Sequence, residues 1–188
     1  FKKAEAAYAW AKTHPDALYD QDKINQTYDP DITTGTYVDS SADDEFFWAA
    51  SELYHATQTP AYLEDVKTFM PETFTLMSWG KVAALGIFEW LQYEKRMLAQ
   101  KPFWGDTPFG FRIGINEEEQ EIIDRCKKML LEYCDQSIEA VENSCYNSAY
   151  GNSPEDFIWG CSSSFCDQAI CFLFAYELTG DRKYVENA

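Results

Sequence analysis

Oxygen-bearing side chains are concentrated in residues 39–45 of the sequence. Hydroxyl and carboxylate groups stand at Asp39, Ser40, Ser41, Asp44 and Glu45. Calcium is bound in proteins by about six to eight hard oxygen ligands of these kinds. The stretch lacks the alternating acids and central glycine of an EF-hand loop. A calcium site of another kind is therefore one interpretation of these residues, to be weighed against two others.

The acids also suit the start of a helix or, less well, an acid–base pair. Ser41 and Asp44 resemble a capping box, and Asp43, Asp44 and Glu45 would complement the positive end of a helix dipole. The catalytic carboxylates of inverting glycosidases instead face each other across a cleft at roughly 6.5–9.5 Å. Neighbouring residues on one helical turn point in different directions, so the pattern alone favours a helix start.

Apolar residues recur with a helical period along most of the chain. Asn116 is predicted to cap a long helix, because three glutamates follow it and apolar residues then continue to Val141. Segments rich in Asp, Gly, Pro or Ser predict loops at residues 15–43, 101–114 and 143–157. We expect helices at residues 1–14, 44–57, 60–68, 78–98, 117–141, 163–179 and from 182 onward. No segment predicts a strand, so the expected fold class is all-α.

Composition and charge exclude several classes of function. Fifteen basic and 32 acidic residues give a net charge of −17. Such a surface repels phosphate backbones and anionic lipids, so we expect no nucleic-acid or membrane-surface partner, whereas a neutral sugar polymer is compatible with it. Aromatic residues make up 16% of the chain, which is typical of a folded core. No apolar run reaches the roughly 18 residues of a membrane span.

The six cysteines do not form a zinc-binding pattern. They lie in the last third of the chain without a Cys-x-x-Cys pair, and both histidines are far from them in sequence. Cys126, Cys134 and Cys171 fall on apolar helical stripes and are expected to be buried free thiols. A disulfide among Cys145, Cys161 and Cys166 is left open by the spacing, and so is the redox compartment.

An internal repeat indicates paired helices. The stretches "YHATQTPAYLEDV" and "YELTGDRKYVENA" begin 122 residues apart, at Tyr54 and Tyr176. Each predicts a helix end, a short polar turn and a new helix with an aromatic residue that packs back on its predecessor. Recurrent helical hairpins are typical of bundles, solenoids and α/α toroids, and the wide spacing favours a toroid. Helical pattern at both chain ends, with no signal peptide, predicts that residues 1–188 are part of a longer chain.

Two blocks of the sequence resemble glycoside hydrolase family 9, the cellulase family. "TGTYVDSSADDEFFWAASELYHATQTPAYL" is similar to the family's block around Asp-Glu-Phe-Phe-Trp-Ala-Ala, and "FIWGCSSSFCDQAICFLFAYELTGDRKY" resembles a later helix. "MSWGKVAALGIFEWL" fits the helix between them more loosely. The resemblance implies an (α/α)6 barrel, of which this chain holds about half, and a secreted or periplasmic enzyme that hydrolyses β-1,4-glucans with inversion.

The family's catalytic motifs are missing from this sequence. Its catalytic base belongs to an Asp-Ala-Gly-Asp motif, and its acid is a glutamate near the C-terminus that accompanies a His-x-Arg motif; neither His14 nor His55 begins such a motif. We therefore expect residues 1–188 to be the middle part of a family 9 catalytic domain. The chain alone should be inactive and should need the remainder of the same domain as its partner. It should also expose apolar helix faces.

Two sets of site residues follow from the resemblance. Some members bind calcium beside the Asp-Glu pair, which puts forward Ser40, Ser41, Asp44 and Glu45 as ligands of a structural Ca²⁺. Where those members place a further aspartate after a tryptophan, this chain has Gly80 after Trp79.

The second set is expected to bind the glucan. Trp159 matches a cleft tryptophan that stacks on a glucosyl ring, and Tyr37 and Asp39 are further substrate-binding candidates. Phe103 and Trp104 could line the cleft, although nothing in the resemblance supports this. A core tryptophan at a helix start is the alternative for Trp159.

Two other functions remain open at this point. A complete, non-catalytic carbohydrate-binding or scaffold module predicts a stable fold without flanking sequence. A sugar isomerase or epimerase of the α/α-toroid type would rely on cavity histidines, and the two histidines here lie in no convincing loop.

Overall fold

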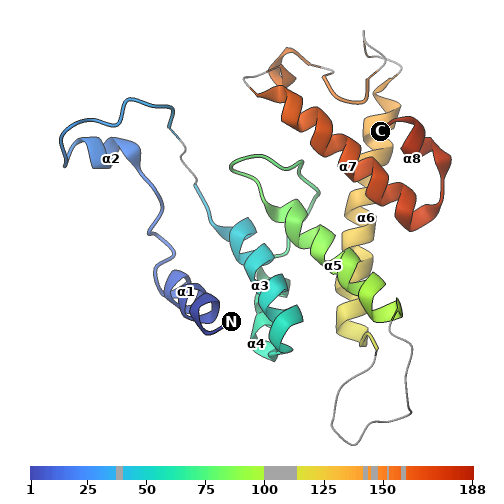
Figure 1. Ribbon diagram of the computed structural model, residues 1–188, viewed down its shortest axis with the longest axis horizontal. Coiled ribbons are helices and arrows are strands. Elements are labelled where there is room, and N and C mark those ends of the chain that lie inside the picture. The colour runs from blue at the N-terminus through green and yellow to red at the C-terminus, as the bar shows by residue number, and fades with distance from the viewer. Residues whose placement is uncertain (37–39, 100–113, 142–143, 145–147, 152, 158–159) are drawn as a thin grey trace, which may run out of the picture. The chain divides into compact units, whose positions relative to one another are not determined.

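The computed structural model is helical throughout its described part, which comprises residues 1–36, 40–99, 114–141, 144, 148–151, 153–157 and 160–188. Figure 1 shows helices joined by loops, with no strand among these residues. The elements are α1 (Lys2–Thr13), α2 (Gln21–Asn25), α3 (Asp43–Thr57), α4 (Pro60–Phe69), α5 (Ala83–Ala99), α6 (Glu117–Glu139), the 3₁₀ turn η2 (Pro154–Asp156), α7 (Cys161–Thr179) and α8 (Arg182–Glu186). No helix of this part is long and apolar enough to cross a membrane.

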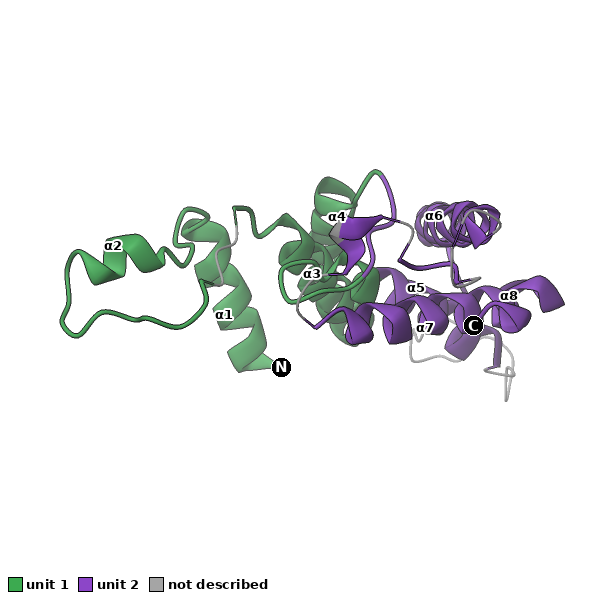
Figure 2. Ribbon diagram, turned by 90° about the horizontal axis from the view of Figure 1, so that it is seen from above, with its two compact units in different colours: residues 1–72, 77–86 green, residues 73–76, 87–188 purple. Residues whose placement is uncertain are grey.

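The chain divides into two compact units, shown in different colours in Figure 2. Unit 1 comprises residues 1–72 and 77–86, and unit 2 comprises residues 73–76 and 87–188. The expected helices are present in both, but the structure differs from the sequence prediction at two places. Helix α2 lies inside the predicted loop, and residues 78–82, predicted to be helical, precede α5 instead.

Helix α2 is held by hydrogen bonds between side chains and backbone groups. Hydrophobic periodicity in the sequence gives no sign of such bonds. Asp20 accepts a hydrogen bond from the backbone N–H of Lys23 at 3.0 Å and caps the helix. Gln21, a buried residue, donates from Nε2 to the carbonyl oxygens of Ile32 and Thr34, both at 3.1 Å. These bonds close the segment between α1 and α3 on itself.

The core of unit 1 forms where α1, α3 and α4 meet. The ring of Tyr8 on α1 lies edge-on to Phe46 of α3 and to Tyr62 of α4, with centroids 5.7 and 5.6 Å apart. The Tyr8 hydroxyl donates to Oδ2 of Asp65 at 3.0 Å. Burial and this hydrogen bond raise the pKa of Tyr8. A single tyrosine therefore connects all three helices.

In unit 2 the predicted cap of α6 is confirmed. Asn116 Oδ1 accepts from the backbone N–H of Glu119 at 2.7 Å, and Glu119 Oε2 accepts from the N–H of Asn116 at 2.9 Å, which completes a capping box. Glu119 is fully buried, and its Oε1 also accepts from the Tyr93 hydroxyl at 3.2 Å. The core continues where Phe88 of α5 stacks on Phe174 of α7 at 4.3 Å.

The sequence repeat is a structural repeat. Helices α3 and α7 both end in a left-handed residue, Gln58 and Gly180, whose backbone N–H donates at 2.7 Å to the carbonyl oxygen of Tyr54 and Tyr176 respectively. A second helix follows in each case. In addition, and beyond what was predicted, Tyr62 of α4 lies against Tyr8 of α1, and the Tyr184 hydroxyl of α8 donates to Asp135 on α6 at 2.7 Å.

The cysteines on apolar stripes are buried free thiols, as predicted. Cys126, Cys134 and Cys171 are fully buried and unpaired. Burial raises the pKa of the Cys126 and Cys134 thiols to about 12. Cys161 and Cys166 are also free, and Cys145 lies outside the described residues.

Candidate functional site

The oxygen-bearing stretch lies at the start of α3, where the predicted capping box does not form. Ala42 is the N-cap and makes no side-chain cap hydrogen bond. The Ser41 hydroxyl accepts instead from the backbone N–H of Asp43 at 3.2 Å. Asp43, Asp44 and Glu45 occupy the first turn, so the predicted helix start with acids at the positive end of its dipole is confirmed.

Asp44 connects this helix start to the segment before α5. Its Oδ2 accepts a hydrogen bond from the backbone N–H of Val82 at 2.7 Å. One turn further along, a Cβ placed on Gly86 would lie 2.6 Å from Cε1 of Phe47. Because both contacts advance together along the two helices, α3 and the start of α5 run in the same direction in close contact within unit 1.

A tight turn precedes α5 and presents Trp79 to solvent. Ser78 and Lys81 form an antiparallel bridge, with backbone N–H···O distances of 3.0 and 3.2 Å in the two directions. Trp79 and Gly80 are the two residues between them. Trp79 is 64% exposed.

The four predicted calcium ligands lie together in sequence at this helix start, but they are a partial donor set. Among the described residues no group of three or more His, Cys, Asp or Glu side chains is arranged to hold a metal. The Ser41 hydroxyl and one oxygen of Asp44 already accept backbone hydrogen bonds. Gly80 supplies no side-chain oxygen. Ser40, Ser41, Asp44 and Glu45 therefore fall short of the roughly six to eight oxygens of a calcium shell, and the calcium site stays a prediction.

The predicted glucan-binding residues cannot be placed in the same way. Tyr37, Asp39 and Trp159 lie outside the described residues, as do Phe103 and Trp104. Their expected roles stay predictions.

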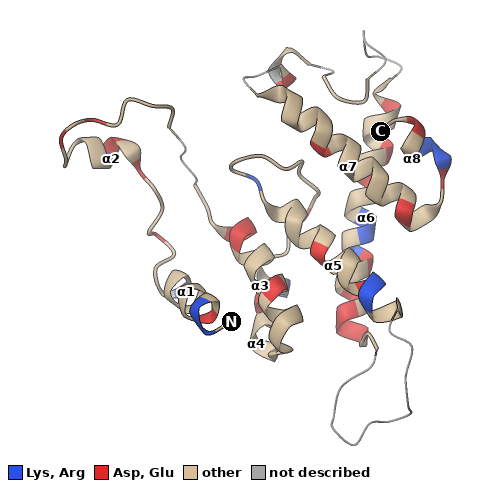
Figure 3. Cartoon of the chain, viewed as in Figure 1, with Lys and Arg blue, Asp and Glu red and all other residues tan. Residues whose placement is uncertain are grey.

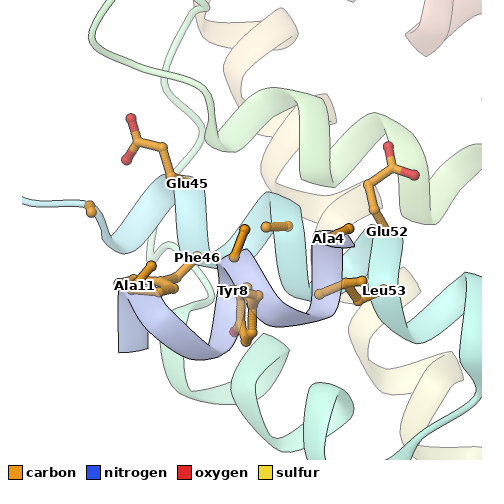
Figure 4. A pocket seen from close by; sticks show the side chains of 10 residues that line it. Ala4, Tyr8, Ala11, Glu45, Phe46, Glu52 and Leu53 are labelled. Atoms are coloured by element: carbon orange, nitrogen blue, oxygen red, sulfur yellow. The ribbon is translucent and has the colours of Figure 1, made fainter. Parts of the chain in front are cut away.

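An apolar groove of about 430 Å³ runs between α1 and α3 in unit 1. Figure 4 shows Ala4, Tyr8 and Ala11 of α1 facing Phe46 and Leu53 of α3. The carboxylates of Glu45 and Glu52 point away from the α1 side chains at its edge. Because polar groups do not converge inside the groove, it is suited to apolar packing and not to the orientation of a sugar.

Charged side chains of the described residues are not concentrated at one site. Figure 3 shows acidic residues spread over both units, including the first turns of α3 and α6. The described lysines and arginines are largely paired with them, for example Lys12 with Asp65 at 2.5 Å and Lys127 with Glu94 at 2.6 Å. This distribution agrees with a neutral ligand better than with an anionic one.

Paired helices that repeat along an all-α chain are typical of helical bundles, solenoids and α/α toroids. Comparison with known families is more specific: residues 1–188 match the model of glycosyl hydrolase family 9, and the chain belongs to this family. Its fold is accordingly that of the family's (α/α)6 barrels. Both the family and the fold class predicted from the sequence are confirmed.

Individual relatives agree with this assignment. The chain is 41% identical over 186 residues to a xyloglucan-specific endo-β-1,4-glucanase of Bacteroides ovatus. The matched region covers 98% of this chain and 29% of that protein. It is also 28% identical to endoglucanase C of Cellulomonas fimi. That match covers 96% of this chain and 14% of the endoglucanase. A solved structure of the Bacteroides ovatus family 9 protein superposes with a TM-score of 0.80 at 41% identity, over 97% of this chain and 30% of that one.

A more distant structure shows the same fold. The AaCel9A complex with cellobiose-like isofagomine has a TM-score of 0.66 at 21% identity, over 95% of this chain and 29% of that one. The chain thus spans about 30% or less of each of these relatives.

Sequence reasoning missed the contact between Asp44 and Val82 and the exposed turn that it holds. The tetrapeptide Ser78-Trp79-Gly80-Lys81 carries a turn signal in its glycine, which the helical period of the following residues obscured.

Proposed function

We propose that residues 1–188 form the middle part of a family 9 catalytic domain that hydrolyses β-1,4-linked glucans with inversion of the anomeric carbon. The observation that carries the proposal is the 41% identity to a xyloglucan-specific endo-β-1,4-glucanase along 98% of this chain. The substrate class is accordingly a neutral β-glucan, which the net charge of −17 does not repel.

The catalytic carboxylates are proposed to come from other parts of the domain. An inverting hydrolase needs one carboxylate to activate water and a second carboxylic acid to protonate the leaving oxygen. The Asp-Ala-Gly-Asp motif of the family is not among residues 1–188, and the relatives are more than three times as long. These residues would supply part of the barrel wall and glucan-binding side chains, and would be inactive alone.

The exposed apolar residues of helix α7 support the proposal that unit 2 is part of a larger barrel. Residues 169–176 of this helix are apolar on all sides, and Ile170, Leu173 and Tyr176, spaced three residues apart, are 39%, 49% and 40% exposed. A helix that is apolar all round belongs in the interior of a protein. We propose that the remainder of the same domain covers this face. Because glucan polymers do not enter cells, the enzyme is proposed to act in the periplasm or outside the cell.

The test compares the full reading frame that contains these residues with the isolated 188-residue chain. Both are incubated with cellotetraose and with xyloglucan oligosaccharides, and the products are followed by anomer-resolved NMR. The proposal expects the full protein to release the α-anomer first and the isolated chain to release nothing. A full protein that binds glucans without cleaving them would overturn the hydrolase proposal in favour of a carbohydrate-binding module. Cleavage by the isolated chain would overturn the assignment of the carboxylates to other segments.

A further inference from the structure

We propose that the apolar groove between α1 and α3 binds a helix from the remainder of the same domain, outside residues 1–188. The inference rests on the proposed function, in which these residues are one part of a longer catalytic domain, and deepens it by assigning a partner to a surface of unit 1. The relatives are more than three times as long as this chain, so a domain of their length has ample sequence to supply such a helix.

The groove combines buried large side chains with alanines that are not buried. Tyr8 of α1 and Phe46 and Leu53 of α3 are only 7%, 8% and 6% exposed. The other apolar residues of the lining are all alanines, and each is exposed or half-buried: Ala4, Ala7, Ala11, Ala42 and Ala49. Because alanine side chains fill little space, α1 and α3 leave a volume of about 430 Å³ between them.

An apolar space of this kind between two helices suits the side chains of a third helix. An amphipathic helix places apolar residues at positions i, i+3, i+4 and i+7 into such a groove. The interior of a folded domain contains few voids larger than a water molecule, so a groove of about 430 Å³ is expected to be filled when the domain is whole. The small alanines on both sides leave room for Leu, Ile or Met side chains from the partner helix.

The charge at the edge of the groove favours a partner helix with basic flanks. Glu52 lies at this edge and is exposed, and its Oε1 accepts a hydrogen bond from the Trp48 indole N–H at 3.2 Å. Lys or Arg residues beside the apolar stripe of the partner would complement this edge. A second copy of the chain fits less well, because its net charge of −17 would bring two acidic surfaces together.

Ala9 offers a matched control on the same helix. Ala7 and Ala9 are both exposed residues of α1, but only Ala7 lines the groove. At 3.6 residues per turn the two positions are about 200° apart around the helix axis. A change at Ala9 therefore tests the exposure of α1 without reaching the proposed binding surface.

The first experiment measures how fast N-ethylmaleimide labels the full protein carrying Ala7→Cys or Ala9→Cys. Both substitutions are small, and near-UV circular dichroism checks that each variant is folded. Mass spectrometry of the peptide with the substitution separates the new thiol from the six native cysteines. A bound helix should slow the labelling of Ala7→Cys at least about tenfold relative to Ala9→Cys, and the two rates should become equal in urea.

A photo-cross-link then identifies what covers the groove. The full protein carries p-benzoylphenylalanine in place of Glu52, at the exposed edge of the groove, and is irradiated and digested. The inference expects a cross-link within one molecule to a helical segment outside residues 1–188. A cross-link between two molecules would overturn it in favour of a second copy. Cross-links confined to residues 1–188, or protection of Ala7→Cys without any cross-link to another segment, would also overturn it.

These outcomes are distinguishable from failure of the proposed function, because neither measurement requires a glucan. If the full protein cleaves cellotetraose but Ala7→Cys and Ala9→Cys are labelled within about twofold of each other, the inference is overturned and the proposed function stands. If Ala7→Cys is protected and the cross-link forms, but the full protein cleaves no β-glucan, the hydrolase proposal fails and the bound helix stands.

Discussion

Oδ2 of Asp44 lies 2.7 Å from the backbone nitrogen of Val82 and accepts its hydrogen bond. Through this bond an acid at the first turn of α3 also caps the start of α5, because the N–H groups at a helix start have no partner within their own helix. The acids at residues 43–45 are thus first of all structural. Their proposed role as calcium ligands has to be compatible with this bond.

Replacement of Asp44 tests the structural role. Asp44→Ala leaves the Val82 N–H without its acceptor and should lower the free energy of unfolding by about 0.5–2 kcal/mol, the usual range for loss of a helix cap. Asp44→Asn retains an acceptor oxygen and should lower the free energy of unfolding by less than Asp44→Ala does. Urea denaturation measures both. Asp43→Ala serves as a control, since that exposed side chain on the same turn contributes only to the helix dipole; a loss as large as that of Asp44→Ala would contradict the capping role.

Gly86 marks the close approach of α3 and α5. Alanine in a helix interior normally stabilises relative to glycine by about 0.5–1 kcal/mol. Here the new Cβ would lie 2.6 and 2.7 Å from two ring atoms of Phe47, so Gly86→Ala should instead lower the free energy of unfolding by about 1–3 kcal/mol. Thermal and urea denaturation report the sign of the change.

Two further variants check the origin of that effect. Gly80→Ala meets no atom within 4 Å and should be nearly neutral. The double variant Phe47→Leu with Gly86→Ala should lose less stability than the sum of its single variants, because the smaller side chain relieves the clash. Additive losses would contradict a direct contact between these two residues.

Gly80 is the position at which the predicted calcium site lacks an acid. An aspartate side chain fits there, because nothing lies within 4 Å of its Cβ. We expect Ca²⁺ to raise the melting temperature of the wild-type protein and to raise that of Gly80→Asp by more, because a third carboxylate would then be available beside Asp44 and Glu45. Gly80→Asn is the control of equal size without the charge. Identical calcium responses in wild type, Gly80→Asp and Gly80→Asn would argue against an ion at this place.

Asp135 should contribute a pH-dependent part of the stability of unit 2. Burial disfavours its charged form, but hydrogen bonds from Lys183 and Tyr184 and the charge of Lys183 outweigh burial and hold the pKa of Asp135 below its ordinary value of 3.8. A lowered pKa in the folded state gives stabilisation that is present above pH 3.8 and is lost as the pH falls through the folded-state pKa. The difference in melting temperature between wild type and Asp135→Asn should therefore be largest near neutral pH and should vanish in acid. A difference independent of pH would contradict this assignment.

Local sequence signals predicted most helices but not their mutual contacts. The capping box of Asn116 and Glu119 and the repeated turns after Tyr54 and Tyr176 depend on residues close in sequence, so their chemistry is visible in the sequence. Helix α2 was not predicted because Gln21 and Asn25 hold it through hydrogen bonds to backbone groups of residues 32 and 34. Such bonds produce no hydrophobic periodicity in the sequence. The turn at residues 78–81 was not predicted because the apolar pattern of α5 continues into these residues.

For the candidate site, too, the sequence predicted local placement but not contacts between distant residues. Spacing identified Ser41, Asp44 and Glu45 as a group at a helix start, and that placement is confirmed. It did not indicate that Asp44 would be engaged by Val82, 38 residues away. Nor could it distinguish Trp79, which is exposed, from Trp90, which lies 11 residues later and is fully buried.

The sequence by itself determined the all-α class, the helical hairpins and the buried thiols, because periodicity, capping residues and turn residues act over short distances along the chain. Membership of the family was indicated separately, by the resemblance of two sequence blocks to those of known members. The tertiary structure decided which oxygen of Asp44 is occupied, which tryptophan reaches solvent, and that α3 and α5 start side by side. Those properties depend on contacts between residues far apart in sequence, and such contacts are fixed only when the helices pack.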